Sequence, residues 1–353
     1  MRLEDMRPLG RLPTGNLPVV LSRRVLPVGN TRRYRIATDR FIDRPHVVPV
    51  TVVPRLNSRA FDQSGPGALP MKRRTLLRGL AAGMAGALAG GAVAGAPPLR
   101  IGLTPVFLDD QAAFLNDWRR YLAVRLGRPV AFVQRASYRE IIEQVVMGGV
   151  DIAWVCGYPY VQQLSRMRLL AVPLYHGQPL YRSYFIVPAI DRTSTSLDDL
   201  DDQIFAFSDP NSNSGYLYTL YQLSQRGRAP ERFFRRTFFT WSHRRVVEAV
   251  AVGMANGGAV DGYVWDTLER IHPEITGQTR VVEQSGKFGF PPFVAAASLS
   301  QAEFDAVQSV LMDMGRDETG TRLLEKLNLD GFVSGTVSLY DEIAHMARAT
   351  GRL

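Results

Sequence analysis

From about residue 100 onward, the sequence predicts an α/β protein built as two similar lobes. Short apolar runs typical of strands alternate with helical segments, a pattern that indicates mostly parallel sheets flanked by helices. A helix-then-strand pattern also occurs twice, over residues 137–154 and again over residues 242–265. Between these copies an apolar strand runs into a polar turn that opens a helix, at residues 205–216. Because clefts between lobes commonly hold ligands, we expect a binding site there.

Composition indicates an ordinary globular protein and excludes some functions. The chain has 353 residues, 46% of them hydrophobic and 21% charged, enough for two lobes with cores. Its formal charge of +9 comes from the first hundred residues, since residues 101–353 hold 25 Lys and Arg against 28 acids. The part of the chain expected to fold therefore has no excess of positive charge of the kind that binds nucleic acid, and we expect no nucleic-acid partner.

Cys156 is the single cysteine of the chain, which excludes an internal disulfide and a multi-cysteine metal site. It follows the apolar pair Trp154-Val155 at the expected end of a strand. We interpret it as a buried, inert thiol, with a nucleophile as the alternative.

The first 94 residues divide into two segments, which we interpret as an N-terminal extension followed by an export signal. Residues 1–70 are rich in Arg and Pro without apolar periodicity, so we expect them to be disordered or to lie upstream of the true start. Residues 71–94 combine a basic start, a weakly apolar Ala/Gly run and a small-x-small end, and Arg73-Arg74 resembles a twin-arginine signal. A membrane anchor is the alternative, but the run is short and barely apolar. We expect a mature protein that is soluble after about Gly95.

In the first expected lobe, glycines and a serine mark the ends of helices. Gly127 stops one helix, Ser137 caps the next, and Gly148-Gly149 closes it. The elements expected in this lobe and at the start of the next are strands over 100–106, 129–133, 150–155, 169–174 and 181–187, and helices over 111–126, 138–147, from 158 and over 196–200.

The stretch from Phe205 to Tyr216 is the centre of the functional argument. Asp209-Pro210-Asn211 forms a turn, and three polar residues then occupy the first turn of a helix that ends at Gly227; they are Ser212, Asn213 and Ser214. The first N–H groups of a helix have no partner within it and carry the positive end of its dipole, so this turn can hold an oxyanion without Lys or Arg. The alternative is that Ser212 is only an N-cap.

The second copy of the helix-then-strand pattern begins at Ser242. Ser137 and Asp151 are 14 positions apart, whereas Ser242 and Asp261 are 19 apart. The two copies are therefore similar segments of different length and no strict repeat. Chance similarity between βα units is the alternative. Further expected elements are strands over 279–283 and 293–297 and helices over 301–314, 320–327 and 340–349.

Together these motifs resemble the periplasmic phosphonate-binding proteins of ABC importers, which include phosphate and phosphite binders. The resemblance covers about residues 100–332 and rests on Tyr138 at a helix start, Val150-Asp-Ile-Ala-Trp, Tyr184-Phe-Ile-Val, Phe207-Ser-Asp-Pro-Asn-Ser-x-Ser-Gly-Tyr, Ser242-His and Ala259-Val-Asp-Gly-Tyr-Val-Trp. It implies a type II periplasmic-binding-protein fold that closes on its ligand about two crossover strands. One lobe would comprise residues 95–184 and 283–353, the other residues 185–282. It also implies a soluble, monomeric periplasmic protein without cofactor or metal.

The resemblance implies a set of ligand-binding residues. Those at the central helix start would hold the phosphoryl oxygens, tyrosine hydroxyls and His243 would donate from either side, and an acid would accept a proton still on the ligand. The implied residues are Tyr138, Tyr181, Ser212, Asn213, Ser214, Gly215, His243, Asp261 and Tyr263. A purely structural role is the alternative for three of them. Tyr138 could be a core residue, His243 a neighbour of a helix cap, and Asp261 an acidic residue in a turn.

Two departures from the family pattern bear on the ligand. Asn213 stands where the family usually has Thr, and the late loop has Phe290-Pro291-Pro292 where many relatives carry an acid. Without that acid to pair an ammonium group, we expect a phosphate-like, phosphite-like or simple phosphonate ligand.

Capture of this ligand for an ABC permease is the leading hypothesis, and sensing it for a kinase with the same fold is the alternative. An enzyme is the third hypothesis. The sequence has no metal-binding histidine pair, nucleophile elbow or Walker loop. A triad of Ser214, His243 and Asp261 would lack the strained elbow, so we expect no catalysis.

Overall fold

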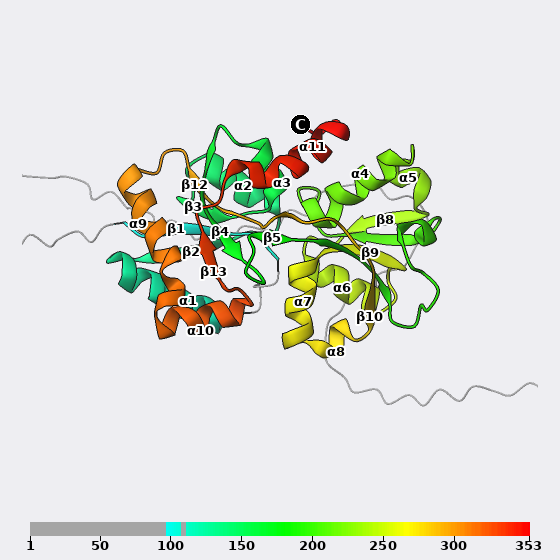
Figure 1. Ribbon diagram of the computed structural model, residues 1–353, viewed down its shortest axis with the longest axis horizontal. Coiled ribbons are helices and arrows are strands. Elements are labelled where there is room, and N and C mark those ends of the chain that lie inside the picture. Colours follow the sequence, from blue (N-terminus) through cyan, green and yellow to red (C-terminus); the bar gives the residue numbers. More distant parts are fainter. Residues whose placement is uncertain (1–96, 107–110) are drawn as a thin grey trace, which may run out of the picture. The chain divides into compact units, whose positions relative to one another are not determined.

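The computed structural model describes residues 97–106 and 111–353 (Figure 1). All of these belong to one of the two contact units of the chain, Gly86–Leu353. The expected extension, residues 1–70, and the expected export signal, residues 71–94, lie outside the described residues. Within residues 97–106 and 111–353, no helix has the length and apolar character needed to cross a membrane.

The first sheet has six strands in the order β13-β4-β12-β3-β1-β2. β1 is parallel to both β2 and β3, whereas β12 is antiparallel to β3 and β4, and β13 is antiparallel to β4. The strands are β1 Leu99–Leu103, β2 Val130–Gln134, β3 Ile152–Trp154, β4 Met167–Leu174, β12 Phe293–Ala296 and β13 Gly331–Val333.

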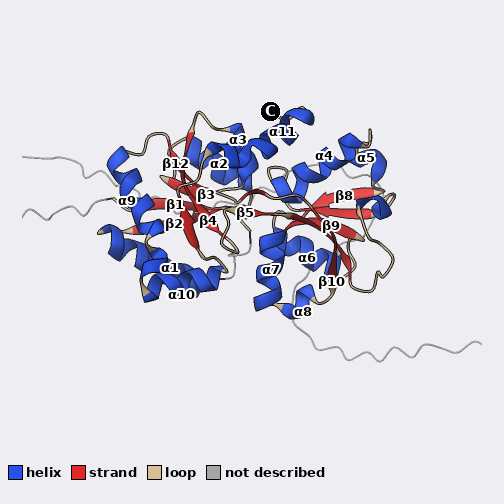
Figure 2. Cartoon of the chain, viewed as in Figure 1, coloured by secondary structure: helices blue, strands red, loops and turns tan. Residues whose placement is uncertain are grey.

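Helices cover both faces of the first sheet (Figure 2). The connections from β1 to β2 and from β2 to β3 cross the sheet in opposite directions, so right-handed crossovers place α1 and α2 on opposite faces. α9 and α10 contact α1, and α11 contacts α3. The helices are α1 Ala112–Leu126, α2 Tyr138–Val146, α3 Gly157–Gln162, α9 Gln301–Met312, α10 Glu318–Leu327 and α11 Asp341–Ala349, with single turns at Met314–Arg316 and Val337–Tyr340.

The second sheet has five strands in the order β10-β6-β9-β7-β8, again with helices on both faces. Its strands are β6 Ser183–Pro188, β7 Ile204–Phe207, β8 Arg236–Phe239, β9 Gly257–Asp261 and β10 Thr279–Gln284. Its helices are α4 Tyr218–Gln225, α5 Pro230–Phe233, α6 His243–Ala251, α7 Gly262–Ile271 and α8 Pro273–Thr276, with a short turn at Leu197–Leu200 and a π-helical turn at Asn213–Leu217.

Both sheets share one strand order, which supports the internal similarity of the two helix-then-strand segments in the sequence. β12-β3-β1-β2 in the first sheet corresponds to β6-β9-β7-β8 in the second. Two α/β lobes are therefore confirmed, but the sheets are mixed and not mostly parallel as expected. β6 and β12 are antiparallel to their neighbours β9 and β3 because the chain comes into each of them from the hinge. Each of these two strands therefore starts at the end of the sheet where the parallel strands finish.

A two-stranded ribbon lies between the sheets (Figure 1). β5 Leu180–Tyr181 pairs antiparallel with β11 Phe288–Gly289, and the chain passes from one sheet to the other through these strands. The expected lobe boundaries after residues 184 and 282 fall inside β6 and β10, so the second sheet takes in residues 183–284.

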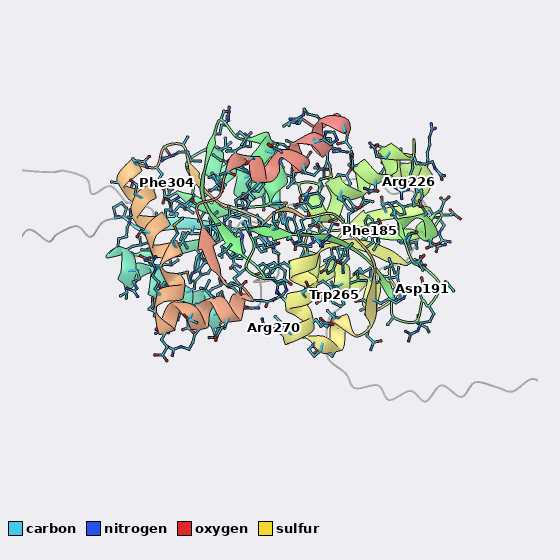
Figure 3. The ribbon with its side chains drawn as sticks, in the orientation of Figure 1. Phe185, Asp191, Arg226, Trp265, Arg270 and Phe304 are labelled. Atoms are coloured by element: carbon cyan, nitrogen blue, oxygen red, sulfur yellow. The ribbon has the colours of Figure 1, made fainter. Side chains whose placement is uncertain are left out.

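Aromatic side chains fill the centre of each lobe. In the first, Trp118 is completely buried and its ring lies 5.2 Å from Phe132 and 6.1 Å from Phe293. In the second, Phe185 of β6 and Phe205 of β7 contact edge to face, and Figure 3 labels Phe185 near the middle of this lobe. These cores make each lobe a rigid support for the loops at the ends of its strands.

Candidate ligand-binding site

A small cavity lies where strands and helix starts of the two lobes meet. The space available to the centre of a water molecule is about 30 Å³, more than one water needs. The first lobe lines it with residues just after β1, at the end of β3, at the start of α2 and before β12, and the second with the starts of α6 and α7. The lining residues are Leu103, Thr104, Val106, Tyr138, Trp154, Cys156, His243, Asp261, Tyr263, Phe290 and Pro291. Carboxyl ends of parallel strands are the usual ligand site of such sheets.

Ser212 caps the helix that follows β7. Its Oγ accepts a hydrogen bond from Gly215 N at 2.9 Å, and the helix opens with the π-helical turn Asn213–Leu217 before α4. The cap assignment is thus confirmed, and Ser212 has a second contact besides it. Its Oγ lies 3.3 Å from Nε2 of His243, the first residue of α6.

The protonation of His243 follows from its partners. Nδ1 accepts the backbone N–H of Asp261 at 3.0 Å, so the ring proton resides on Nε2 and points to Ser212 Oγ. Complete burial lowers the pKa of His243 to about 3, and the ring is neutral at pH 7. Ser212 Oγ therefore accepts two hydrogen bonds, which leaves its own proton free to donate. His243 lines the cavity and orients Ser212.

Asn213 joins the helix start to the first lobe and to the hinge. Its backbone N–H donates to Cys156 Sγ at 3.2 Å, and its Nδ2 donates to the Tyr181 hydroxyl at 2.9 Å. Its Oδ1 is buried and has no hydrogen-bond partner among the described residues. Burial raises the pKa of Cys156 to about 11, so the group that accepts from Asn213 is a neutral thiol.

Ser214 and Gly215 lie within the packed start of the helix. Ser214 Oγ is buried without a hydrogen-bond partner in the described part of the chain, and Ser183 Oγ donates to its carbonyl at 2.7 Å. A Cβ at Gly215 would stand 1.9 Å from Ser208 Oγ and 2.9 Å from His243 Cε1. Glycine is therefore what lets this turn pack against the imidazole of His243.

Three other predicted residues face the cavity. The Tyr138 hydroxyl has no hydrogen-bond partner within residues 97–106 and 111–353, and burial raises its pKa well above the usual value, so it stays a phenol and can donate. Asp261 Oδ1 caps α7 by accepting from Val264 N at 3.4 Å, and burial raises the pKa of this carboxyl to about 8. The Tyr263 hydroxyl donates to the Leu327 carbonyl of the first lobe at 2.5 Å.

Hydrogen bonds also connect the lobes around the cavity. Tyr138 N donates to the buried Asp209 carboxylate at 3.1 Å, and Ser242 Oγ donates to the Val106 carbonyl at 3.2 Å. Ser242 stands at the N-cap of α6, but its side chain makes no cap hydrogen bond and contacts the first lobe instead. Arg270, labelled in Figure 3, donates from α7 to Asn328 after α10. The lobes are therefore held in a closed arrangement.

The structure separates the predicted residues into two layers. Tyr138, His243, Asp261 and Tyr263 line the cavity. The other five are buried outside the lining. Four of them are hydrogen-bonded to it or to one another, namely Tyr181, Ser212, Asn213 and Gly215, and Ser214 accepts instead from Ser183 through its carbonyl. Sequence reasoning did not assign Thr104, Trp154 or Phe290 to the site, although all three lie next to the ends of strands or the hinge. None of the described lining residues is Lys or Arg.

Comparison with known proteins agrees with this architecture. Residues 101–340 match the model of the family described as "ABC transporter, phosphonate, periplasmic substrate-binding protein". The phosphate-import protein PhnD of Mycolicibacterium smegmatis is 28% identical over 160 residues, 42% of this chain and 49% of the relative. The phosphonates-binding periplasmic protein of Escherichia coli is 26% identical over 221 residues, 61% of this chain and 64% of the relative. The chain thus spans about half to just under two thirds of these relatives' lengths.

Two solved structures share the fold. One is the binding protein component of an ABC phosphonate transporter from Pseudomonas aeruginosa, with a TM-score of 0.68, 22% identity, and coverage of 72% of this chain and 87% of the other. PhnD1 from Prochlorococcus marinus in complex with methylphosphonate gives a TM-score of 0.66 at 21% identity, over 72% of this chain and 98% of the other. With a family match over more than half of its length, this chain belongs to the periplasmic phosphonate substrate-binding proteins of ABC transporters.

Proposed function

We propose that the chain is an extracytoplasmic solute-binding protein that captures a phosphonate, phosphite or phosphate-like oxyanion and delivers it to an ABC permease. The main observation is the cavity between two closed lobes, whose nearby donors are all neutral. Tyr138 and Ser212 each keep a hydroxyl proton that has no acceptor among the described residues. Neutral donors suit a carrier because the ligand must also be released.

The names of the relatives support this ligand class. One curated relative is a phosphate-import protein, the other a phosphonates-binding periplasmic protein, and the Prochlorococcus marinus structure contains methylphosphonate. For this chain we propose export by the signal at residues 71–94, location in the periplasm, and a monomeric mature form. No feature of the described residues favours the sensor-kinase alternative.

We also propose that the protein is not an enzyme. In a serine triad the imidazole would contact the nucleophile through one nitrogen and a carboxylate through the other. Here Nε2 of His243 contacts Ser212 and not Ser214, and Nδ1 accepts a backbone N–H of Asp261 and not its carboxylate. The imagined triad of Ser214, His243 and Asp261 is therefore not assembled.

Isothermal titration of the mature protein with phosphate, phosphite, methylphosphonate and 2-aminoethylphosphonate tests the proposal. We expect binding of at least one of the first three and weaker binding of 2-aminoethylphosphonate, because Phe290-Pro291 brings no carboxylate for its ammonium group. Tyr138→Phe should weaken binding about 10-fold to 150-fold, since a hydrogen bond from a neutral hydroxyl to an anion is lost. Absence of heat and of any melting shift with all four ligands would refute the proposal.

A further inference from the structure

Asp209 is a buried carboxylate that joins the two lobes and lies outside the cavity lining. It stands two residues after β7 in the second lobe and is completely buried. Its Oδ1 accepts a hydrogen bond from Asn211 N at 2.7 Å, within the turn that leads to Ser212. Its Oδ2 accepts from Tyr138 N of the first lobe at 3.1 Å. One side chain therefore holds the turn before Ser212 and the helix that carries Tyr138.

The N-terminus of α2 helps to stabilise this carboxylate. Tyr138 is the first residue of α2, and the helix's own cap, Ser137, accepts the N–H of Glu140. The N–H of Tyr138 is not used by that cap, so it can donate to an acceptor from outside the helix. A buried carboxylate is costly without compensation, and no cation pairs with Asp209 within residues 97–106 and 111–353. Part of the compensation therefore comes from the other lobe, through this N–H and the positive end of the α2 dipole.

We propose that Asp209 is a positioning residue that prolongs the retention of the bound oxyanion by holding α2 against the turn before Ser212. An oxyanion held by Ser212 can also reach the Tyr138 hydroxyl only while the lobes are closed. The bond between Asp209 and Tyr138 N breaks when the lobes part, so it stabilises the closed form without contact to the ligand. The inference rests on the proposed function, since it needs an oxyanion between the lobes.

Loss of this bond should affect release of the ligand and not its capture. The ligand enters before the lobes close, so the association rate does not depend on a contact that only the closed form makes. A hydrogen bond to a charged group corresponds to about 10-fold to 150-fold in an equilibrium constant. We therefore expect the dissociation rate to rise by about this factor and the association rate to stay nearly unchanged.

Asp209→Asn removes one of the two acceptor oxygens and keeps the size of the side chain, so it cannot hold both N–H groups. The matched control is Asp191→Asn. Asp191 Oδ1 accepts from Thr193 N at 2.9 Å, the same spacing as from Asp209 to Asn211. Its carboxylate contacts residues of the second lobe, and Figure 3 labels it at the end of that lobe away from the first. The control thus alters a turn in the same lobe without a bond between lobes.

A second pair of variants tests the same bond from the first lobe. Tyr138→Ala and Tyr138→Pro both remove the phenol, but only proline also removes the N–H that Asp209 accepts. Proline is favoured at the first position of a helix, and Ser137 already has the extended backbone that a residue before proline adopts. Tyr138→Pro should release the ligand about 10-fold to 150-fold faster than Tyr138→Ala. Addition of Asp209→Asn should accelerate release from Tyr138→Ala and not from Tyr138→Pro.

The experiment measures both rates with methylphosphonate and with inorganic phosphate, by stopped-flow fluorescence of Trp154, which lines the cavity. Isothermal titration gives the Kd, which should rise by the same factor as the dissociation rate. We expect faster release from Asp209→Asn and unchanged release from Asp191→Asn. Unchanged release from Asp209→Asn overturns the inference and leaves the proposed function standing. Equal acceleration by Asp209→Asn in the Tyr138→Ala and Tyr138→Pro variants does the same, because Asp209 would then act only within its own turn.

The remaining outcomes are also decisive. Absence of binding of both ligands by the wild type in isothermal titration overturns the inference together with the capture of these oxyanions. If circular dichroism shows that Asp209→Asn is unfolded, the two Tyr138 variants decide, and equal release rates refute the inference. If the Tyr138 variants bind neither ligand, Asp209→Asn and Asp191→Asn decide, and equal release rates again refute it.

Discussion

Ser212→Ala tests the central link of the site, the hydroxyl that joins a helix cap to a buried histidine. The substitution removes the acceptor of Gly215 N–H and of the Nε2–H of His243. Loss of an N-cap costs about 1 kcal/mol of unfolding free energy, and a buried donor left without its acceptor costs about 1–3 kcal/mol more. Because the residue is completely buried, water cannot replace the lost oxygen without rearrangement. We expect a total loss of about 2–4 kcal/mol.

Ser300→Ala provides the matched control for this variant. Ser300 caps α9, where its side chain accepts from Glu303 N at 3.3 Å, and it has no histidine partner among the described residues. Its loss should cost only the cap, about 1 kcal/mol. Urea unfolding of both variants gives the difference, with equal slopes as the check that the unfolded states are comparable.

Equal destabilisation by the two substitutions would refute the histidine contact of Ser212. In that case Ser212 would be only a cap, and the orientation of its free proton toward the ligand would lose its support. A larger loss in Ser212→Ala, together with weakened oxyanion binding that Ser300→Ala does not show, would be the expected pattern.

Three further outcomes are expected from the same geometry. The pKa of His243 is lower in the folded than in the unfolded state, so this residue stabilises the fold above about pH 6.5 and loses that effect as the pH falls toward 3. The pKa of Asp261 is higher in the folded state, so this residue stabilises the fold at low pH and loses that effect as the pH rises to about 8. The two slopes oppose each other between about pH 4 and 6.5, so unfolding free energy should decline mainly from pH 6.5 to 8, and Asp261→Asn should abolish that decline in urea titrations at each pH. Tyr263→Phe leaves the Leu327 carbonyl without its donor and should lower the unfolding free energy by about 1–3 kcal/mol; a change below about 0.3 kcal/mol would contradict the bond between lobes. Gly215→Ala places a Cβ 2.8 Å from Ser208 Cβ and should lower the unfolding free energy by about 1–3 kcal/mol in thermal or urea unfolding; an unchanged unfolding free energy would contradict the close packing of this turn.

Local signals in the sequence were enough for most elements and for the stretch that carries the site. The helix start at Ser212 was predicted because turn residues and a serine cap precede an apolar helix, and these are properties of neighbouring residues. The strand β8 was not predicted, since Arg236-Thr237-Phe238-Phe239 is short and has no alternation of apolar and polar residues. Its place beside β7 is fixed by parallel pairing with residues about 30 positions away.

The hydrogen-bond partners of individual side chains could not be predicted from local sequence patterns. Ser137 and Ser242 look equivalent in the sequence, and both stand at the N-cap of a helix. Ser137 caps its helix as predicted, in a capping box with Glu140, whereas the Ser242 hydroxyl donates to the Val106 carbonyl, 136 positions away in the other lobe. A serine at such a position satisfies whichever backbone group the tertiary structure brings close, and only the closed lobes bring the Val106 carbonyl there.

The same reasoning explains why Asn213 is compatible with a site that usually has Thr. Its backbone N–H is used by Cys156 Sγ, so the residue is held from the first lobe, and its longer side chain reaches the Tyr181 hydroxyl on the hinge strand. A threonine hydroxyl is one bond shorter than this amide and could not make the same 2.9 Å contact without movement of the hinge. Asn213 therefore connects the helix start proposed to bind the oxyanion to the hinge strand β5. Its Oδ1, which has no hydrogen-bond partner among the described residues, is an acceptor that a hydrogen-bearing ligand or a water molecule would satisfy.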